Sequence, residues 1–358
     1  MYQRKHFYKI RLYIYFLIYV VIFIKFSTSF VNAETYKISK IELTKPYELN
    51  FNKQIVIENA FRIGFLELVK KITISDDYFK IQNTNIKIKK RLVDSFTVTD
   101  EKFAENKYIA TFEVNFSKKL VRNYLEKKNI FISIPIEKKI FTMPILIDLD
   151  KKEALLYSEN YFYKNWNNSR EKFYLLDFIL PNEDLDDIET IKKKFENIED
   201  YDFKEIISKY DLKDYLIIIF FKYDKSLKVL SKMNLNNEKI IFNKIFNDVE
   251  LNNQEKSEKI ISTLKTKFEN QWKKVNQVNT SIKLPITIQV DTTNIDLIKK
   301  LETELSKLDL VSNFYINNFD SKMTTYKIIF NGTPNRFIKE INKGEIKLNT
   351  SFKIWRVE

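Results

Sequence analysis

The sequence predicts an α+β protein built from three small two-layer α/β-sandwich domains in tandem, the last of them ferredoxin-like (βαββαβ). Two observations predict this class. Segments whose apolar residues alternate with a period of two are interleaved with segments whose apolar residues recur at three-and-four spacing, as strands and amphipathic helices require. Hydrophobic residues make up 44% of the 358 residues, and there is no cysteine. Each domain must therefore be stable through its own core rather than through disulfides.

The N-terminal segment has the three parts of a secretory signal peptide. Residues 1–11 contain Arg4, Lys5, Lys9 and Arg11 and no acid, and Leu12–Ile24 is an apolar run of 13 residues. A spanning helix needs about 20 apolar residues, so this run is too short for one. We expect residues 1–33 to be a signal peptide that is cleaved after Ala33. The alternative is an uncleaved anchor in the inner membrane, and both readings place the remainder in the periplasm or outside the cell.

The first domain is predicted for residues 34–130 in the order β-α-β-β-α. A strand is expected from Tyr36 to Leu43, a weaker helix at 83–91, and strands at 92–103 and 107–116. Asn52 can cap the main helix, and Gly64 on its inward face indicates a close approach to a sheet. The inward residues of this helix are Ala60, Phe61, Phe65, Leu68, Val69 and Ile72. A last helix starts at Ser117, and we expect Leu120, Val121 and Leu125 to face inward.

The second domain is predicted for residues 131–277. Strands are expected within 131–150, 172–181 and 214–223, and a helix at about 202–210. The 214–223 segment is almost wholly apolar, which indicates a strand covered on both faces. Two further strands, near 227–234 and 239–246, form a hairpin through Asn236 and Asn237. The closing helix, at about 253–275, has a core stripe of Ile260, Ile261, Leu264, Phe268 and Trp272.

The third domain is predicted for residues 280–358 in the order β-α-β-β-α-β. The strand at 281–290 alternates strictly, and Asn294 caps a helix with Ile298, Leu301, Leu305 and Leu308 inward. Strands follow near 311–318 and 323–330. Thr333 and Pro334 open a short helix that ends at Gly344, and the segment 347–357 supplies the last strand.

Missing residue types exclude most enzyme chemistry. The single histidine is His6, in the leader, so the mature chain has neither histidine nor cysteine for nucleophilic triads, zinc ligation or imidazole catalysis. The three glycines (Gly64, Gly332 and Gly344) cannot form a phosphate-binding loop. The sequence therefore assigns no catalytic residue, no cofactor-binding residue, no metal ligand and no cofactor.

Three local patterns are weighed as sites. The acidic run at 182–189 fails the calcium-loop pattern, because Asp187 and Lys193 stand where glycine and glutamate are needed, and it suits a helix N-terminus instead. Ser–Lys spacing occurs at Ser169 with Lys172 and at Ser262 with Lys265, without the other elements of such hydrolases. The aromatic and amide cluster at 161–170 could stack on sugars or a peptide, and packing under a loop is the preferred interpretation.

Three stretches carry a resemblance to a known family. They are "NAFRIGFLELVKKIT", "YIATFEVNFSKKLVRNYLEKKNI" and "IISTLKTKFENQW". On these the mature chain resembles an uncharacterised proteobacterial envelope family, domain of unknown function family 2066. A glycine expected after the first helix is absent, since Ser75 follows Ile74. The middle region is similar in element order to the N-terminal domain of the periplasmic protein TolB, which implies a docking module without catalysis.

The resulting hypothesis is an exported, non-catalytic protein of the cell envelope. It would be a periplasmic binding or assembly module that engages another envelope protein or complex through sheet edges or domain faces. The alternative is a cell-wall hydrolase based on carboxylates or a Ser–Lys pair. The leader holds five of the 61 basic residues, which leaves 56 basic and 48 acidic residues in the mature chain. This mild excess allows weak binding to an anionic lipid or glycan surface. No nucleic acid is expected as a partner.

Overall fold

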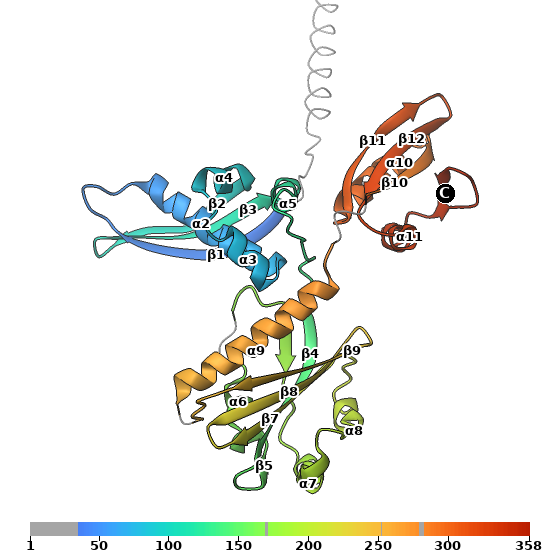
Figure 1. The fold of residues 1–358 in the computed structure, drawn as a ribbon. Helices are drawn as coiled ribbons and strands as arrows, with labels where there is room; N and C mark the ends of the chain where they lie inside the picture. The colour runs from blue at the N-terminus through green and yellow to red at the C-terminus, as the bar shows by residue number, and fades with distance from the viewer. Residues whose placement is uncertain (1–34, 169–170, 252, 279–282) are drawn as a thin grey trace, which may run out of the picture. The chain divides into compact units, whose positions relative to one another are not determined.

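The computed structural model describes residues 35–168, 171–251, 253–278 and 283–358, so the predicted leader at 1–33 lies outside the described residues. Three sheets, of three, six and five strands, follow one another along the chain, and helices pack against them (Figure 1). The predicted α+β class is therefore confirmed. The division into domains at 130 and 280 stays a prediction. No helix within the described ranges is long and apolar enough to cross a membrane.

The first sheet has the order β1-β3-β2. Its elements are β1 (Thr35–Pro46), α2 (Lys53–Ile72), α3 (Ser75–Ile81), α4 (Ile86–Leu92), β2 (Val93–Ala104), β3 (Lys107–Ser117) and α5 (Lys118–Glu126). Asn52 caps α2 by accepting a hydrogen bond from the Gln54 amide at 2.8 Å, as predicted. The helix α3 was not predicted. Leu120 was expected inside but is 44% exposed, because the inward face of α5 belongs to Val121 and Leu125, four residues apart.

The second sheet has the order β5-β4-β7-β8-β9, and β6 pairs with β4. Its elements are β4 (Lys138–Asp148), β5 (Glu153–Leu155), α6 (Tyr161–Asn165), β6 (Leu176–Ile179), α7 (Leu185–Lys193), α8 (Lys204–Ser208), β7 (Tyr215–Tyr223), β8 (Ser226–Leu235), β9 (Glu238–Phe246) and α9 (Gln254–Val275). One core lies under α9 and the other lies on the face that holds α7 and α8. The central strand β7 contributes to both cores, as its apolar sequence predicted. The short elements β5 and α6 were not predicted.

The third sheet has the order β11-β12-β10-β14-β13. Its elements are β10 (Leu284–Asp291), α10 (Ile295–Lys307), β11 (Val311–Phe319), β12 (Met323–Phe330), α11 (Pro334–Lys343), β13 (Leu348–Asn349) and β14 (Trp355–Val357). In the sheet, the strands β11-β12-β10-β14 follow the spatial order of a ferredoxin-like sheet. The predicted last strand at 347–357 is instead two short antiparallel strands. As a result β14 runs parallel to β10, whereas the last strand of a βαββαβ ferredoxin-like sheet runs antiparallel to the first.

Gly64 allows α2 to approach the first sheet closely. A Cβ atom at this position would lie 3.0 Å from Cδ1 of Ile41 on β1 and 3.3 Å from Cε2 of Phe116 on β3. Both neighbours belong to the buried core, where there is little room to move. The predicted helix–sheet approach is confirmed.

We expect Gly64→Val to lower the free energy of unfolding by about 1–3 kcal/mol, because the larger side chain overpacks this contact. Thermal or denaturant unfolding of residues 34–358, which contain all described elements, measures the effect. Arg62→Val is the matched control, since it puts the same β-branched residue at an exposed position of α2. Equal destabilisation by both variants would contradict the packing explanation.

Candidate functional site

Helix α9 is the element around which a candidate site is built. Asn253 caps it by accepting a hydrogen bond from the Lys256 amide at 3.1 Å. The predicted stripe of Ile260, Ile261, Leu264, Phe268 and Trp272 is buried against the second sheet. Successive residues of a helix are turned by about 100°. The residues on either side of this stripe therefore form two further faces, which differ strongly in burial.

One of these faces carries three buried charged residues, Lys265, Glu269 and Lys273, at intervals of four. They are 2%, 2% and 4% exposed. The Glu269 carboxylate accepts hydrogen bonds from the backbone N–H groups of Leu175, at 3.0 and 3.1 Å, and Leu176, at 2.7 Å. These residues lead into β6. Glu269 thereby attaches α9 to the strand at this side of the sheet through charge-assisted hydrogen bonds.

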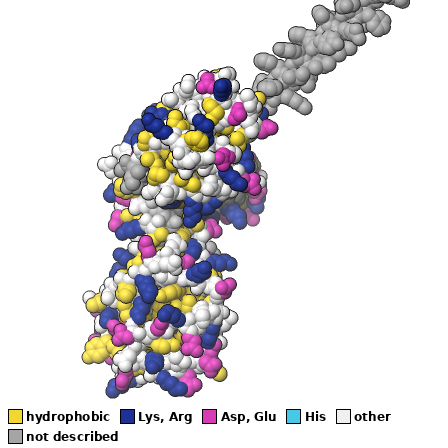
Figure 2. Space-filling model, turned by 90° about the vertical axis from the view of Figure 1, so that its right-hand side faces the viewer, with side chains coloured by type: hydrophobic (Ala, Val, Ile, Leu, Met, Phe, Trp, Pro, Cys, Tyr) yellow, Lys and Arg dark blue, Asp and Glu magenta, His cyan; other side chains and the backbone are white. Residues whose placement is uncertain are grey.

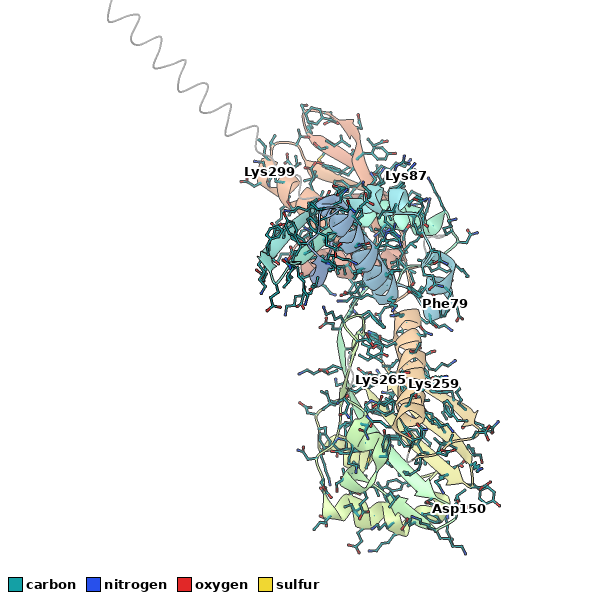
Figure 3. All side chains as sticks on the ribbon, turned by 90° about the vertical axis from the view of Figure 1, so that its left-hand side faces the viewer. Phe79, Lys87, Asp150, Lys259, Lys265 and Lys299 are labelled. Carbon is teal, nitrogen blue, oxygen red and sulfur yellow. The ribbon has the colours of Figure 1, made fainter. Side chains whose placement is uncertain are left out.

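The two lysines beside Glu269 have different surroundings. The Nζ atom of Lys265 lies 5.5 Å from the ring centroid of Phe178, 5.8 Å from Trp166 and 5.9 Å from Tyr174, within cation–π distance. Lys259, on the same helix, is exposed (Figure 3). The Nζ of Lys273 donates to the carbonyl of Lys70. Burial lowers the pKa of Lys273 to about 8, and the charge of Glu269 opposes this shift.

The structure separates the members of the Ser–Lys pattern at Ser262 and Lys265. The hydroxyl of Ser262 is exposed and donates to the carbonyl of Lys259 at 3.2 Å, whereas Lys265 is turned toward the aromatic rings. Ser169, in the second such pattern, lies outside the described residues, and Lys172 donates to the carbonyl of Lys40 at 2.9 Å. The described geometry therefore gives Ser262 no lysine as a base.

The acidic run at 182–189 begins a helix, as the sequence indicated. Asp184 caps α7 by accepting from the amides of Asp186, at 2.9 Å, and Asp187, at 3.3 Å. Lys209 lies 2.7 Å from both Asp184 and Asp187 and has a raised pKa because of these hydrogen bonds. Across the described ranges, no group of three or more His, Cys, Asp or Glu side chains could hold a metal ion.

In the described part of the cluster, residues 161–168, the rings of Phe162 and Trp166 pack in the core under α9, in line with the packing interpretation. Phe162 and Trp166 have no exposed surface. The ring of Phe162 stacks on Phe220 of β7 with a centroid distance of 3.8 Å and an interplanar angle of 4°. These two rings are therefore not available to stack on a ligand.

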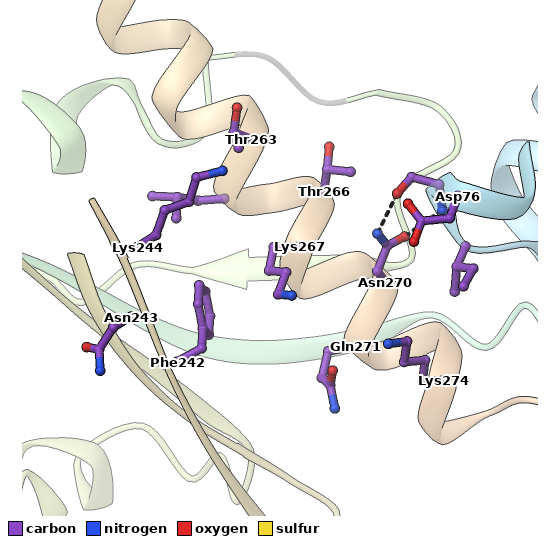
Figure 4. A pocket seen from close by; sticks show the side chains of 13 residues that line it. Asp76, Phe242, Asn243, Lys244, Thr263, Thr266, Lys267, Asn270, Gln271 and Lys274 are labelled. Carbon is purple, nitrogen blue, oxygen red and sulfur yellow. Dashed lines mark hydrogen bonds between the residues drawn. The ribbon is translucent and has the colours of Figure 1, made fainter. Parts of the chain in front are cut away.

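The other polar face of α9 borders a groove of about 380 Å³, which we call the α9–β9 groove. Its lining includes Phe242 and Lys244 from β9 and Thr263, Lys267, Asn270 and Lys274 from α9. Figure 4 shows Phe242 and Lys244 directed from the strand toward the helix, and Asn243 directed away. The groove ends at the start of α3, where the side chain of Asn270 accepts from the Ser75 amide at 2.9 Å and donates to its hydroxyl at 2.7 Å.

The α9–β9 groove is positively charged. Its described lining holds three lysines, Lys244, Lys267 and Lys274, and one carboxylate, Asp76. No carboxylate of the described residues forms an ion pair with any of these three lysines. The Nζ of Lys267 lies 5.9 Å from the ring centroid of Phe242, which joins the helix to the strand across the groove. Such a concentration of ammonium groups attracts anionic partners.

Strand β9 is the end strand of its sheet, and its pairing with β8 is regular over all nine residues. The end strands β2 and β11, by contrast, each pair with shifts of register that indicate bulges. Bulges protect sheet edges from pairing with other chains. On the face of β9 opposite to α9, Ile241 and Ile245 are each 64% exposed. Hydrophobic side chains also lie at the surface between charged ones in Figure 2.

A second depression lies on this opposite face, and we call it the apolar hollow. It has a volume of about 760 Å³ and reaches from β4 to β9. Its apolar lining includes Ile147, Leu149, Phe195, Ile198, Phe221 and Ile245, and the carboxylates Glu196, Glu199 and Asp200 also line it. Lys228, at its rim, forms an ion pair with Glu199 at 3.1 Å. Strand β9 therefore has a basic groove along one face and an apolar hollow at the other.

The sequence did not predict these features. A Lys-Glu-Lys series at intervals of four was a visible signal in α9, but charged residues at such spacing are usually solvent-exposed. The hairpin that contains β9 was predicted, but its position at the end of the sheet depends on pairing that the local sequence does not contain.

The comparisons with known proteins add no function. No family model matches the chain, and no curated protein matches it. A solved structure described as "Crystal structure of uncharacterized protein" aligns with 8% sequence identity, covering 40% of this chain and 95% of its own, with a TM-score of 0.17. A TM-score this low supports no argument. The resemblances to the envelope family and to the TolB N-terminal domain stay predictions.

We expect Glu269→Gln to lower the free energy of unfolding by about 3 kcal/mol, because the buried amides of Leu175 and Leu176 lose their anionic acceptor and the buried ammonium group of Lys273 loses a nearby opposite charge. Denaturant unfolding followed by tryptophan fluorescence measures this, since Trp166 and Trp272 lie in the same core. Glu258→Gln, at an exposed position of α9, is the control and should change stability by less than about 0.5 kcal/mol. A similar small effect of Glu269→Gln would show that the buried carboxylate is dispensable.

The lowered pKa of Lys273 predicts a pH dependence of stability. Between about pH 8 and the unfolded pKa of about 10.4, the unfolded chain binds more protons at this residue than the folded chain does. The penalty of burying the charge is complete below this window and disappears as the pH rises through it. The free energy of unfolding of the wild type, minus that of Lys273→Met, should therefore rise by about 1–3 kcal/mol from about pH 7 to about pH 10. If the free energies of unfolding of the two proteins change with pH in parallel, the predicted effect of Lys273 is refuted.

Proposed function

We propose that the protein is an exported, non-catalytic binding or assembly module of the cell envelope, and that it engages another envelope component by strand addition at β9. The export part of the proposal is supported by the leader-like pattern of residues 1–33. The binding part is supported by the open edge of the second sheet. In strand addition, an extended segment of a partner pairs with an edge strand through main-chain hydrogen bonds.

The regular, exposed edge of β9 is the observation that carries the proposal. Nine residues without a register shift give a partner strand a continuous row of main-chain groups. Ile241 and Ile245 add exposed apolar surface at the same place. A long edge with apolar side chains is costly in an unpaired protein, because it promotes aggregation. A natural partner for β9 would explain why its pairing has no register shift of the kind that interrupts β2 and β11.

The hydrolase alternative gains no support from the described geometry. Ser262 and Lys265 point to different surroundings. The carboxylates of the 182–189 run that lie near each other, Asp184 and Asp187, both bind Lys209, and Asp184 also caps α7. Among the described residues, no specific arrangement favours the hydrolase over a binding function.

A photo-crosslinking amino acid at position 245 tests strand addition in cells that express the full chain. We expect a discrete crosslinked product, and we expect it to disappear when Ile241→Lys is added, because the charge disrupts the apolar face of the edge. The product should contain an extended segment of an envelope protein, identified by mass spectrometry.

The control places the same amino acid at Ile295, which is 60% exposed on α10 in the third domain. Ile295 is nearly as exposed as Ile245, but it lies on a helix and not on the edge strand β9. Equal labelling from both positions, or no product from position 245, would reject β9 as the binding edge.

A further inference from the structure

We propose that the segment that adds to β9 is an amphipathic acidic strand, with carboxylate side chains on the face toward α9 and apolar side chains on the opposite face. This inference rests on the strand addition proposed above and names the chemistry of the partner. It follows from the different surroundings of the two faces of β9, because a strand that joins a sheet continues its alternation of side chains.

The face toward α9 favours carboxylates. Partner residues on this face would lie beside Phe242 and Lys244, with Lys267 and Lys274 across the α9–β9 groove (Figure 4). All three lysines are exposed at their positions, and no described carboxylate forms an ion pair with them. Like charges placed beside them would repel, so the groove also selects against basic segments.

The opposite face favours apolar side chains. Partner residues on this face would lie beside Ile241 and Ile245, which are already exposed. Ile245 also lines the apolar hollow, whose volume of about 760 Å³ can take in one or more large side chains. Burial of apolar surface on both partners would stabilise this side of the added strand.

A second copy of the chain does not fit this description. Strand β9 carries Lys239 and Lys244, at opposite ends, and one acid, Glu238. Pairing two copies of β9 would bring further lysines to the surface that holds Lys267 and Lys274. Neither of these two lysines forms an ion pair with a described carboxylate. The electrostatic repulsion favours an acidic partner over self-association.

Two synthetic nine-residue peptides test the inference, one alternating glutamate with valine and the other alternating lysine with valine. Their binding to residues 34–358 is measured by fluorescence anisotropy at low ionic strength. We expect the acidic peptide to bind about tenfold more tightly, and we expect this preference to shrink in high salt because the charges are screened. A third peptide has the composition of the acidic one but places all its glutamates before all its valines. It should bind more weakly, because each face of the added strand would then carry both glutamate and valine.

Variants of the groove assign the preference to its lysines. Replacing Lys244, Lys267 and Lys274 together by glutamine should abolish the preference for the acidic peptide. The control replaces Lys87, Lys192 and Lys299, which are exposed in other helices, and changes the net charge equally. The control should keep the preference, and circular dichroism verifies that both variants are folded.

Each contrary outcome has a distinct meaning. If the basic peptide binds as well as the acidic one, or neither binds, while position 245 still gives its crosslink, the acidic-strand inference fails and strand addition stands. If position 245 gives no crosslink, the proposed function itself fails. The protein could instead bind anionic phospholipid vesicles. If replacing the groove lysines weakens that binding and Ile245→Lys leaves it unchanged, the groove is a lipid-binding surface rather than part of a strand-addition site. If the wild type forms dimers and Ile241→Lys abolishes them, the edge of β9 serves self-association instead of binding a partner.

Discussion

The placement of α9 on the second sheet depends on the buried carboxylate of Glu269. It binds the backbone N–H groups of Leu175 and Leu176 at the start of β6 and lies between Lys265 and Lys273 on the same helix. In a medium of low dielectric, unpaired charges of this kind would be very costly, so the three residues specify one position of α9 on the sheet. That position in turn fixes the opposite polar face of α9 beside β9. The groove is therefore a consequence of charges that lie on the other side of the helix.

The edge strands of the three sheets differ in how regularly they pair with their neighbours, and this difference bears on the proposed binding. Register shifts interrupt β2 and β11, whereas β9 pairs regularly along its length. The lysines of β9 and the groove can keep this edge soluble while it is empty, because charged side chains oppose pairing between identical chains. The same charges would attract a partner of opposite sign. Solubility and selectivity would thus come from one set of residues.

Much of the fold follows from the sequence because its signals are local. The strict alternation before Val290, the caps at Asn52 and Thr333, and the apolar stripe of α9 each predicted the element that the structure contains. Failures occurred where an element is too short for its period to be seen, as in β5 and α6. The prediction that Leu120 faces inward failed for a related reason. In a helix of only nine residues, packing against neighbouring elements rather than the local pattern decides which face is buried.

By itself, the sequence determined that residues 34–358 contain no histidine or cysteine, and it predicted most of the helices and strands, because residue types and periodicity are local properties. It did not determine the candidate site. Only the tertiary structure decided that Lys265 is buried while Lys267, two residues later, faces a groove. Only the tertiary structure decided that β9 ends its sheet. Burial and strand order arise from contacts between distant segments, and the free energy of a charge or an open strand edge depends on those contacts rather than on its neighbours in the chain.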